Sequence, residues 1–478
     1  MADAGDMNLG LESLKGFAGK ILQAVLGFAG TIIFARVLGR SDFGGFYFLL
    51  SLVFIADRPI RGFGQAVEKR YSEAGARKRE IAGGAILLTA AALVVAGVVV
   101  FALRDLLVQK TNLEQAPVVF VALFVAFGVF YPVQKMLGGE GWISKQTWND
   151  TLRSVLTLPL QLLFVFAGFG AAGMGYGLAA ATLLVVPVAL YFLRIRPSVP
   201  SRSTVASLWS YARYSTVAAF VGKAYDRFDV LLLGTLLTTG AVGNYEAAYK
   251  LTVPATFLAS VVASGLAPKV SNRHSKEQDV SIDVTNGVSY ASLLSIPLFF
   301  GVLAIPRSLV VTAYGSEYAG AAVFLVGLAL YQLLYSQTLM YQHALSGLDL
   351  PDVRMRIDML TLAFNVVAGV ALLTTIGAIG VVVATILAES ARYAMSMLSV
   401  NRRIDGLDAF PRTLFEQVFA AGVMFVIVEA GQRAIVLRSW VQLGLLVGIG
   451  AVTYGVVLLV VSPGLRFTLS SVYRDATS

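Results

Sequence analysis

The chain has 478 residues, of which 57% are hydrophobic and 14% are charged, whereas soluble domains carry about 25% charged residues. It contains no cysteine and two histidines, which excludes disulfides, thiolate catalysis and cysteine-based metal sites. We therefore expect no cofactor and no bound metal. The longest polar stretches, residues 68–80, 194–203 and 271–283, are each too short to fold into a soluble catalytic or nucleotide-binding domain.

Apolar stretches of about twenty residues, each long enough to cross a bilayer, recur about fourteen times. Many are apolar around the whole helix and not on one stripe only. The predicted spans, in chain order, are residues 14–37, 43–65, 81–103, 116–137, 155–167, 174–193, 208–237, 241–267, 288–314, 319–345, 359–374, 377–398, 414–430 and 441–461. The sequence thus predicts an all-α polytopic membrane protein with about 14 transmembrane helices.

Lys and Arg are concentrated in alternate connectors between these spans. One set carries clusters such as 77–79 and 194–196, whereas the opposite connectors 168–173, 238–243 and 374–380 contain neither residue. Because basic connectors stay on the cytoplasmic side, this bias predicts a protein of the cytoplasmic (plasma) membrane with both termini in the cytoplasm. The net charge of +9 is explained by this bias and by contact with anionic lipid, and we expect no nucleic-acid partner.

Two pairs of segments are similar across half the chain. Residues 43–47 before the second span correspond to 242–246 before the eighth, and 170–173 before the sixth correspond to 377–380 before the twelfth. Such repeats are typical of secondary transporters. They predict an N-terminal six-helix lobe (1–200), a C-terminal six-helix lobe (201–403) and two additional C-terminal helices (404–478).

Short motifs resemble those of a known family. Residues 34–39 (FARVLG) with 42–44 (DFG) resemble the signature that opens polysaccharide transport (Wzx-type) flippases. Residues 226–229 and 243–248 resemble that family's seventh-to-eighth span region, and 314–318 resembles its loop between the ninth and tenth spans. The family belongs to the multidrug/oligosaccharidyl-lipid/polysaccharide superfamily, which also holds MATE drug exporters and the lipid II flippase.

This resemblance implies two bundles around a central, often cationic cavity that opens alternately to the two sides. It also implies a flippase that translocates a polyprenyl or dolichyl phosphate- or diphosphate-linked oligosaccharide for polysaccharide or glycoprotein glycan biosynthesis. Its partners would be that lipid-linked oligosaccharide, membrane lipids and glycosyltransferases of the same pathway. We expect a monomer.

Charged residues within the spans are costly, at about 2.5–3.5 kcal/mol each at the bilayer centre, and so need a reason. Four cations, Lys20, Arg58, Lys223 and Arg227, lie in the first, second and seventh spans and are the predicted binding set for the phosphate of the headgroup. The alternative for Lys20 is that its side chain extends to the interface, where it would anchor the helix.

Four carboxylates are candidates for coupling to protons or sodium ions: Asp226, Asp229, Glu246 and Glu389. Simpler roles stay open for two of them. Asp226 could be the local counter-ion of Lys223, and Glu246 could be neutralised by Lys250 at i+4.

A second hypothesis is a MATE-type exporter of small organic molecules coupled to protons or sodium. A cavity for organic cations should be acidic, whereas the charges within these spans lean basic. A membrane-embedded glycosyltransferase is a third hypothesis, but the short extracellular connectors leave little room for a catalytic site. A structural scaffold, or a scramblase that moves lipid without coupling to a gradient, stays open as a further alternative. We predict a transporter and not an enzyme.

Overall fold

The computed structural model describes residues 9–434, 439–467 and 470, and for residues 9–21 and 218 it describes only the backbone. All regular structure in these residues is helical. The helices are α1 (Leu9–Ala56), α2 (Arg58–Tyr71), α3 (Lys78–Ala102), α4 (Arg104–Thr111), α5 (Ala116–Gly139), α6 (Ile143–Phe164), η1 (Val165–Phe169), α7 (Gly170–Leu184), α8 (Val186–Leu193), α9 (Arg202–Leu236), α10 (Thr239–Thr252), η2 (Val253–Thr256), α11 (Phe257–His274), α12 (Ser281–Ala291), α13 (Ser295–Ala304), α14 (Pro306–Tyr314), η3 (Ser316–Tyr318), α15 (Ala321–Gly347), α16 (Pro351–Ile376), α17 (Ala378–Asn401), α18 (Arg412–Ala434) and α19 (Trp440–Val461).

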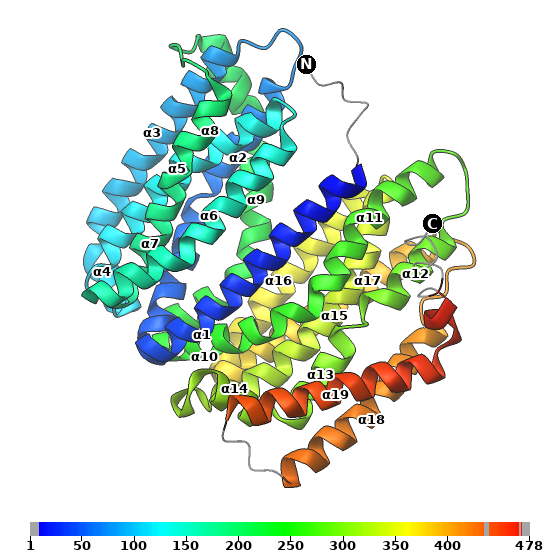
Figure 1. Cartoon of the computed structure of the whole chain (residues 1–478). Helices are drawn as coiled ribbons and strands as arrows, with labels where there is room; N and C mark the ends of the chain where they lie inside the picture. The colour runs from blue at the N-terminus through cyan, green and yellow to red at the C-terminus, as the bar shows by residue number, and fades with distance from the viewer. Residues whose placement is uncertain (1–8, 435–438, 468–469, 471–478) are drawn as a thin grey trace. The chain divides into compact units, whose positions relative to one another are not determined.

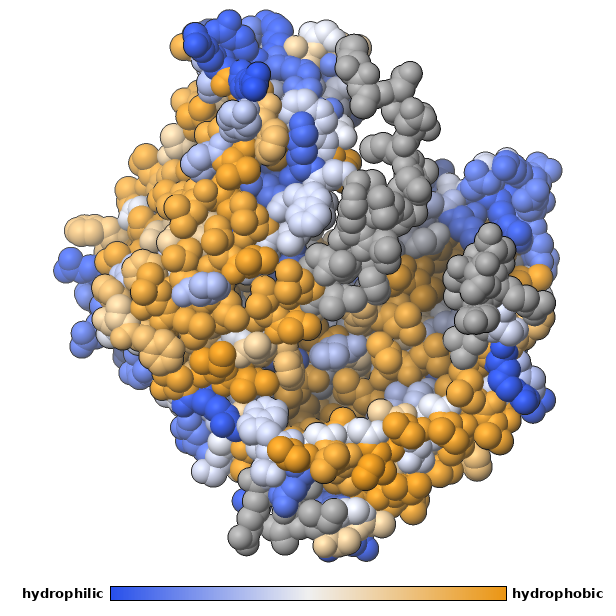
Figure 2. Space-filling model, in the orientation of Figure 1, coloured by the Kyte–Doolittle hydropathy of each residue, from blue (hydrophilic) through white to orange (hydrophobic). Residues whose placement is uncertain are grey.

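Eleven helical stretches in the described residues are long and apolar enough to cross a membrane. The predicted all-α polytopic fold is therefore confirmed, and the count of fourteen spans stays a prediction. Some stretches are long: residues 143–193 form one stretch of 51 residues that includes both the fifth and sixth predicted spans. Figure 2 shows hydrophobic residues along the flanks of the helices and hydrophilic residues near their ends, as expected of helices in a bilayer.

The first predicted span and the first part of the second lie in α1, which is interrupted at a glycine. Gly39 has φ 74° and ψ 168°, a conformation outside the helical region that a residue without a Cβ adopts readily. The second predicted span is interrupted again at Asp57, where α1 ends and α2 begins with Pro59 in its first turn. The backbone therefore bends twice around the segment 40–56.

Gly44 of the 42–44 motif and Gly243 of the corresponding segment 242–246 allow close backbone contact. A Cβ on Gly44 would collide with the backbone of Thr239 and Gly243, and a Cβ on Gly243 would collide with the carbonyl of Arg40. Ser41 and Thr239 also share a hydrogen bond of 2.9 Å between their hydroxyls. The motif residues thus join the turn after Gly39 to the start of α10, which is a packing role.

The chain divides into two compact units, residues 1–243 and 244–478. In the first, α5 packs against α2, α3, α7 and α8, and α9 lies along α2 and α1. In the second, α15 packs against α11, α13 and α17, α16 lies beside α17, and α18 lies beside α19 (Figure 1). The predicted N-terminal lobe ends at residue 200, so the sequence repeat assigns α9 to the second lobe, whereas its packing places it in the first unit. The division into two duplicated lobes and two additional helices stays a prediction.

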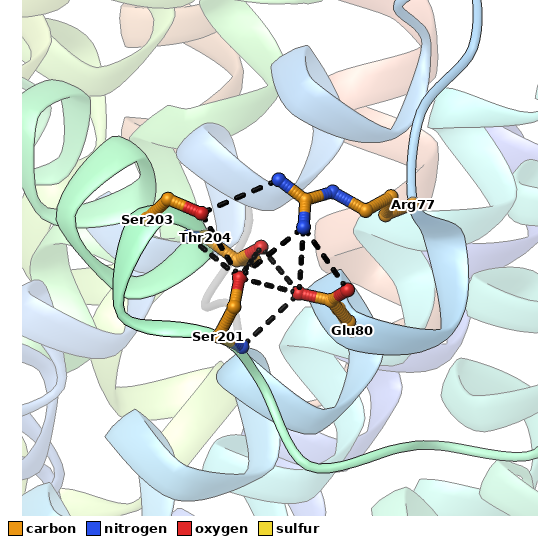
Figure 3. A network of polar contacts seen from close by, with 5 residues as sticks. All are labelled: Arg77, Glu80, Ser201, Ser203 and Thr204. Carbon is orange, nitrogen blue, oxygen red and sulfur yellow. Dashed lines mark hydrogen bonds and ion pairs between the residues drawn. The ribbon is translucent and has the colours of Figure 1, made fainter.

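A polar clasp ties the segment before α9 to the first turn of α3 (Figure 3). The Glu80 carboxylate accepts hydrogen bonds from the Ser201 hydroxyl (2.6 Å), the Ser201 backbone N–H (3.0 Å) and the Thr204 hydroxyl (2.7 Å). Arg77 pairs with Glu80 at 3.2 Å and donates to the hydroxyl of Ser203 at 3.3 Å. Because Ser201 is also the N-cap of α9, the clasp fixes where that helix begins.

Candidate functional site

The junction between α1 and α2 concentrates three charges on adjacent turns. Asp57 is 1% exposed and accepts hydrogen bonds from both Arg58 and Arg61, the latter at 2.8 Å. Arg58 also donates from Nε to the carbonyl of Phe54 at 2.6 Å. Phe54 lies in the last turn of α1, where backbone carbonyls have no partner within the helix. The Arg61 guanidinium lies 4.7 Å from the centre of the Tyr131 ring on α5. The two arginines are thereby held by one buried carboxylate.

Helix α9 approaches this junction because a glycine and a serine meet at the crossing of α2 and α9. Gly62 on α2 faces Thr216, and a Cβ there would lie 2.7 Å from the Thr216 Cα. The Ser215 hydroxyl donates to the carbonyl of Gly62 at 2.9 Å, and the rings of Phe63 and Trp209 lie 5.7 Å apart nearby. Small residues at such crossings let helix backbones approach closely.

Phe54 is the residue at which the cations of α2 and α9 meet, because Arg58 donates to its carbonyl and the two cations of α9 lie near its ring. Lys223 Nζ lies 5.5 Å and Arg227 Cζ 5.4 Å from its centre. Arg58 is held at the same residue by its hydrogen bond to the Phe54 carbonyl, so the three charges share one neighbourhood. The ring itself stacks on Phe127 of α5 at 5.7 Å. Three of the four predicted headgroup residues, Arg58, Lys223 and Arg227, are thus brought together; the side chain of the fourth, Lys20, lies outside the described residues.

Carboxylates accompany these cations without matching them in number. Lys223 pairs with Asp226 at 3.1 Å, and Asp226 is largely exposed. Asp229, one turn further along α9, is 6% exposed. With Asp57, this makes three carboxylates beside the four cations Arg58, Arg61, Lys223 and Arg227, so the cluster carries a net positive charge. Arginine and lysine side chains in a partly desolvated setting can replace the hydration of a phosphate.

The two remaining carboxylates of the predicted coupling set lie in the second unit. Glu246 on α10 is 1% exposed. Glu389 on α17 is fully buried, with its Oε2 3.7 Å from Arg392, and Arg392 in turn pairs with Asp358 of α16 at 2.8 Å. The contribution of Asp358 and Arg392 was not foreseen, because their proximity depends on the packing of α16 against α17. Among the described residues, no group of three or more His, Asp or Glu side chains could hold a metal ion.

Phe54 is the central residue that sequence reasoning missed. A phenylalanine in an apolar span gives no signal by itself, since the sequence does not show that Lys223 and Arg227 lie beside it in the fold. Its spacing of four residues from Arg58 was the one local indication, because residues at i and i+4 share a helix face.

Taken together, a fold made of helices long enough to span a bilayer, with charges gathered inside the first unit, is that of a polytopic membrane transporter. Two solved structures share the fold: the lipid II flippase MurJ in an inward-closed conformation (TM-score 0.78, 12% identity, covering 97% of this chain and 100% of that one) and an inward-facing MATE multidrug transporter (TM-score 0.64, 15% identity, covering 80% and 95%).

The sequence matches the profile of the family described as polysaccharide biosynthesis protein over residues 16–272, and the chain belongs to that family. Two proteins of Haloferax volcanii are similar along nearly the whole length. One, named as a probable low-salt glycan biosynthesis flippase (Agl15), is 29% identical over 475 residues, covering 96% of this chain and 97% of the relative. The other, named as a probable flippase (AglR), is 26% identical over 456 residues, covering 94% and 95%. The predicted family and the prediction of a transporter are thereby confirmed.

Proposed function

We propose that this chain is a flippase that moves a polyprenyl or dolichyl phosphate- or diphosphate-linked oligosaccharide across the cytoplasmic membrane by alternating access. The observation that carries the proposal is the gathering of three cations at Phe54, with an excess of positive charge: Lys223 and Arg227 lie over its ring, and Arg58 donates to its carbonyl. A lipid phosphate must leave water to cross the membrane, and such a cluster offsets the lost hydration. The family and the names of the relatives support the same substrate class.

The experiment is translocation of a labelled polyprenyl-linked oligosaccharide in proteoliposomes. We expect the wild type to move the lipid and the double variant Lys223→Ala/Arg227→Ala to lose at least nine-tenths of that rate. Arg213→Ala is the matched control, because Arg213 lies on the same helix but is exposed and lies over the ring of its neighbour Tyr214. Equal transport by the double variant at normal folding would refute the headgroup site. Transport of an organic cation, but of no lipid-linked sugar, would favour a MATE-type exporter.

Coupling is assigned, within this proposal, to Asp226, Asp229, Glu246 and Glu389. Of these, Asp229, Glu246 and Glu389 are buried, where a change of protonation alters local packing most strongly. Each is tested by replacement with its amide while proton and sodium gradients are imposed in turn. A variant that keeps full dependence on the gradient removes that residue from the coupling set.

The protein is also proposed to function as a monomer with both termini in the cytoplasm, supplied with substrate by glycosyltransferases of the same pathway. Basic residues at the connector ends, including the cluster around Arg77, support this orientation. A reporter-fusion map that places residue 77 outside the cell would overturn it.

A further inference from the structure

A short break between two helices of the second unit interrupts the ninth predicted span, residues 288–314. Helix α12 ends at Ala291 and α13 begins at Ser295, so residues 292–294 lie between them as a turn. We call these three residues the α12–α13 break. Both helices belong to one apolar stretch, Ser281–Ala304, that is long enough to cross a membrane. The break therefore lies midway along this stretch, where lipid offers the backbone no hydrogen bonds.

Two glutamines from other helices replace helical hydrogen bonds that the break removes. In a continuous helix, the carbonyls of Val288 and Ser289 would accept hydrogen bonds from the N–H groups four residues later. Both of those N–H groups bond instead to the carbonyl of Tyr290. Gln337 of α15 donates from Nε2 to the carbonyl of Val288 at 3.2 Å. Gln417 of α18 donates from Nε2 to the carbonyl of Ser289 at 2.7 Å. The break is thus held by side chains of two neighbouring helices.

Oxygen atoms at the break remain unsatisfied by this arrangement. Pro297 has no N–H, so the carbonyl of Leu293 receives no hydrogen bond from the residue four positions later. The hydroxyl of Ser295 and the Oε1 of Gln337 have no hydrogen-bond partner among the residues that the structure describes. Both side chains are buried, Ser295 fully and Gln337 at 7% exposed. Buried oxygen atoms of this kind are costly unless a bound ligand or water satisfies them.

Ser295 lies on the face of the two helices that Gln337 contacts. Val288, Ser292 and Ser295 are spaced i, i+4 and i+7, which places them on one helix face. The backbone at the break stays near helical values, with φ −94° and ψ 1° at Ser292 and φ −99° and ψ −33° at Leu294, so this face continues across the break. Gln337 contacts the face at Val288, and α13 packs against α15 as α12 does. The unsatisfied oxygen atoms of Ser295 and Gln337 therefore belong to the same side of the break.

We propose that the α12–α13 break binds a monovalent metal cation through the hydroxyl of Ser295, the Oε1 of Gln337 and the carbonyl of Leu293. Oxygen ligands suit a hard cation, and a set without carboxylates suits a single positive charge. Carbonyl and amide oxygens can only accept, so a cation satisfies them without donors of its own. The carboxyl end of α12 contributes a partial negative charge at the same point. Helix ends and unwound carbonyls of this kind coordinate sodium in secondary transporters.

The inference goes beyond the proposed coupling carboxylates, none of which is among the three ligands. It also differs from the expectation of no bound metal, which rested on the cysteine and histidine content. Neutral oxygen atoms give no such sequence pattern, and their arrangement here depends on the break and on Gln337. Cation binding is measured without a lipid substrate, so its failure would leave the proposed flippase function untouched.

The experiment measures the binding of radioactive sodium to the full-length protein in nanodiscs, with choline as the background cation. Radioactive rubidium, which stands in for potassium, is tested in parallel. We expect the wild type to bind one of the two ions saturably. Ser295→Ala should weaken that binding about tenfold or more, because an oxygen that contacts a charge is lost. Gln337→Met removes the Oε1 and should abolish the binding. Because Gln337→Met also loses the hydrogen bond to Val288, Ser295→Ala tests the site where the Gln337 variant does not fold.

Thermal unfolding supplies a second measurement of the same site. The bound ion should raise the unfolding midpoint of the wild type above its value in choline, and should raise that of Ser295→Ala less. Ser336→Ala is the matched control, because it removes an equally buried serine hydroxyl of α15 that already donates to the carbonyl of Gln332 at 2.8 Å. That variant should bind the ion as the wild type does. A wild type that binds neither ion, or a folded Ser295→Ala protein with wild-type affinity, would overturn the cation site.

Discussion

Replacing Gly62 by alanine tests whether the close approach of α2 and α9 holds the cation cluster together. The added Cβ would lie 2.7 Å from the Thr216 Cα, whereas carbon atoms in contact prefer about 3.5–4.0 Å. Backbone atoms cannot rotate aside as a flexible side chain can, so the helices must separate by about 1 Å. The hydrogen bond from Ser215 to the Gly62 carbonyl, now 2.9 Å, would then exceed 3.5 Å and be lost.

The expected cost adds two contributions. Overpacking contributes about 1–3 kcal/mol. The lost hydrogen bond contributes about 0.5–1.5 kcal/mol more. A further consequence concerns the site: Lys223 and Arg227, now 5.5 and 5.4 Å from the Phe54 ring, would move out to about 6.5 Å, beyond the range of about 6 Å for a cation–π contact. We therefore expect Gly62→Ala to lose both stability and affinity for the phosphate headgroup.

Thermal unfolding in nanodiscs and lipid binding measure the two effects. At about 2–4 °C per kcal/mol for a unit of this size, the midpoint should fall by about 3 °C or more. The matched control is Gly222→Ala on α9, where a Cβ would meet nothing within 4 Å. That variant should be neutral or stabilised by up to about 1 kcal/mol through helix propensity. A Gly62→Ala protein as stable as the wild type would refute the close-packing argument.

Three further substitutions test other parts of the fold. Glu80→Gln removes the carboxylate of the clasp and should speed proteolysis within residues 194–201; unchanged cleavage would show that the clasp does not hold this segment. Arg392→Leu removes the guanidinium that lies near the carboxylates of Asp358 and Glu389. The free energy of unfolding, measured by thermal unfolding, should fall by about 3–5 kcal/mol, and by less for Arg392→Lys. The hydrogen bond from the backbone N–H of Ser281 lowers the pKa of Asp279. The stability that this bond contributes is therefore present above the ordinary carboxyl pKa and is lost as the pH falls through the lowered value. Asp279→Asn should therefore speed hydrogen exchange at the start of α12 at pH 7 and make no difference in strong acid.

The sequence was sufficient to predict the kind of fold, because long apolar stretches have few alternatives in a bilayer. It also left residues 38–42 as a connector between the first two spans, and the non-helical residue Gly39 lies within that connector. Helix α9 is a different case. It was predicted as the apolar span 208–237, but it is not among the eleven helical stretches of the described residues that are long and apolar enough to cross a membrane.

The arrangement of the site was harder to predict than its members. Arg58 and Lys223 were selected because charge within a span is costly, a rule that needs no structure. That they meet at Phe54 depends on the helix crossing at Gly62 and Thr216, more than 150 residues apart along the chain. One sequence contains no record of such distant contacts. The packing of α9 with the first unit, against the repeat boundary near residue 200, was unpredictable for the same reason.

The clasp before α9 and the packing of that helix have a consequence for biosynthesis. When the ribosome has delivered residue 200, the first unit still lacks the helix that covers Gly62 and Phe63. The 35 residues of α9 require about 2–7 s at about 5–20 residues per second. During that interval the nascent protein exposes the face of α2 that α9 later covers. The Glu80 carboxylate also lacks its hydrogen-bond donors Ser201 and Thr204 until they have been synthesised.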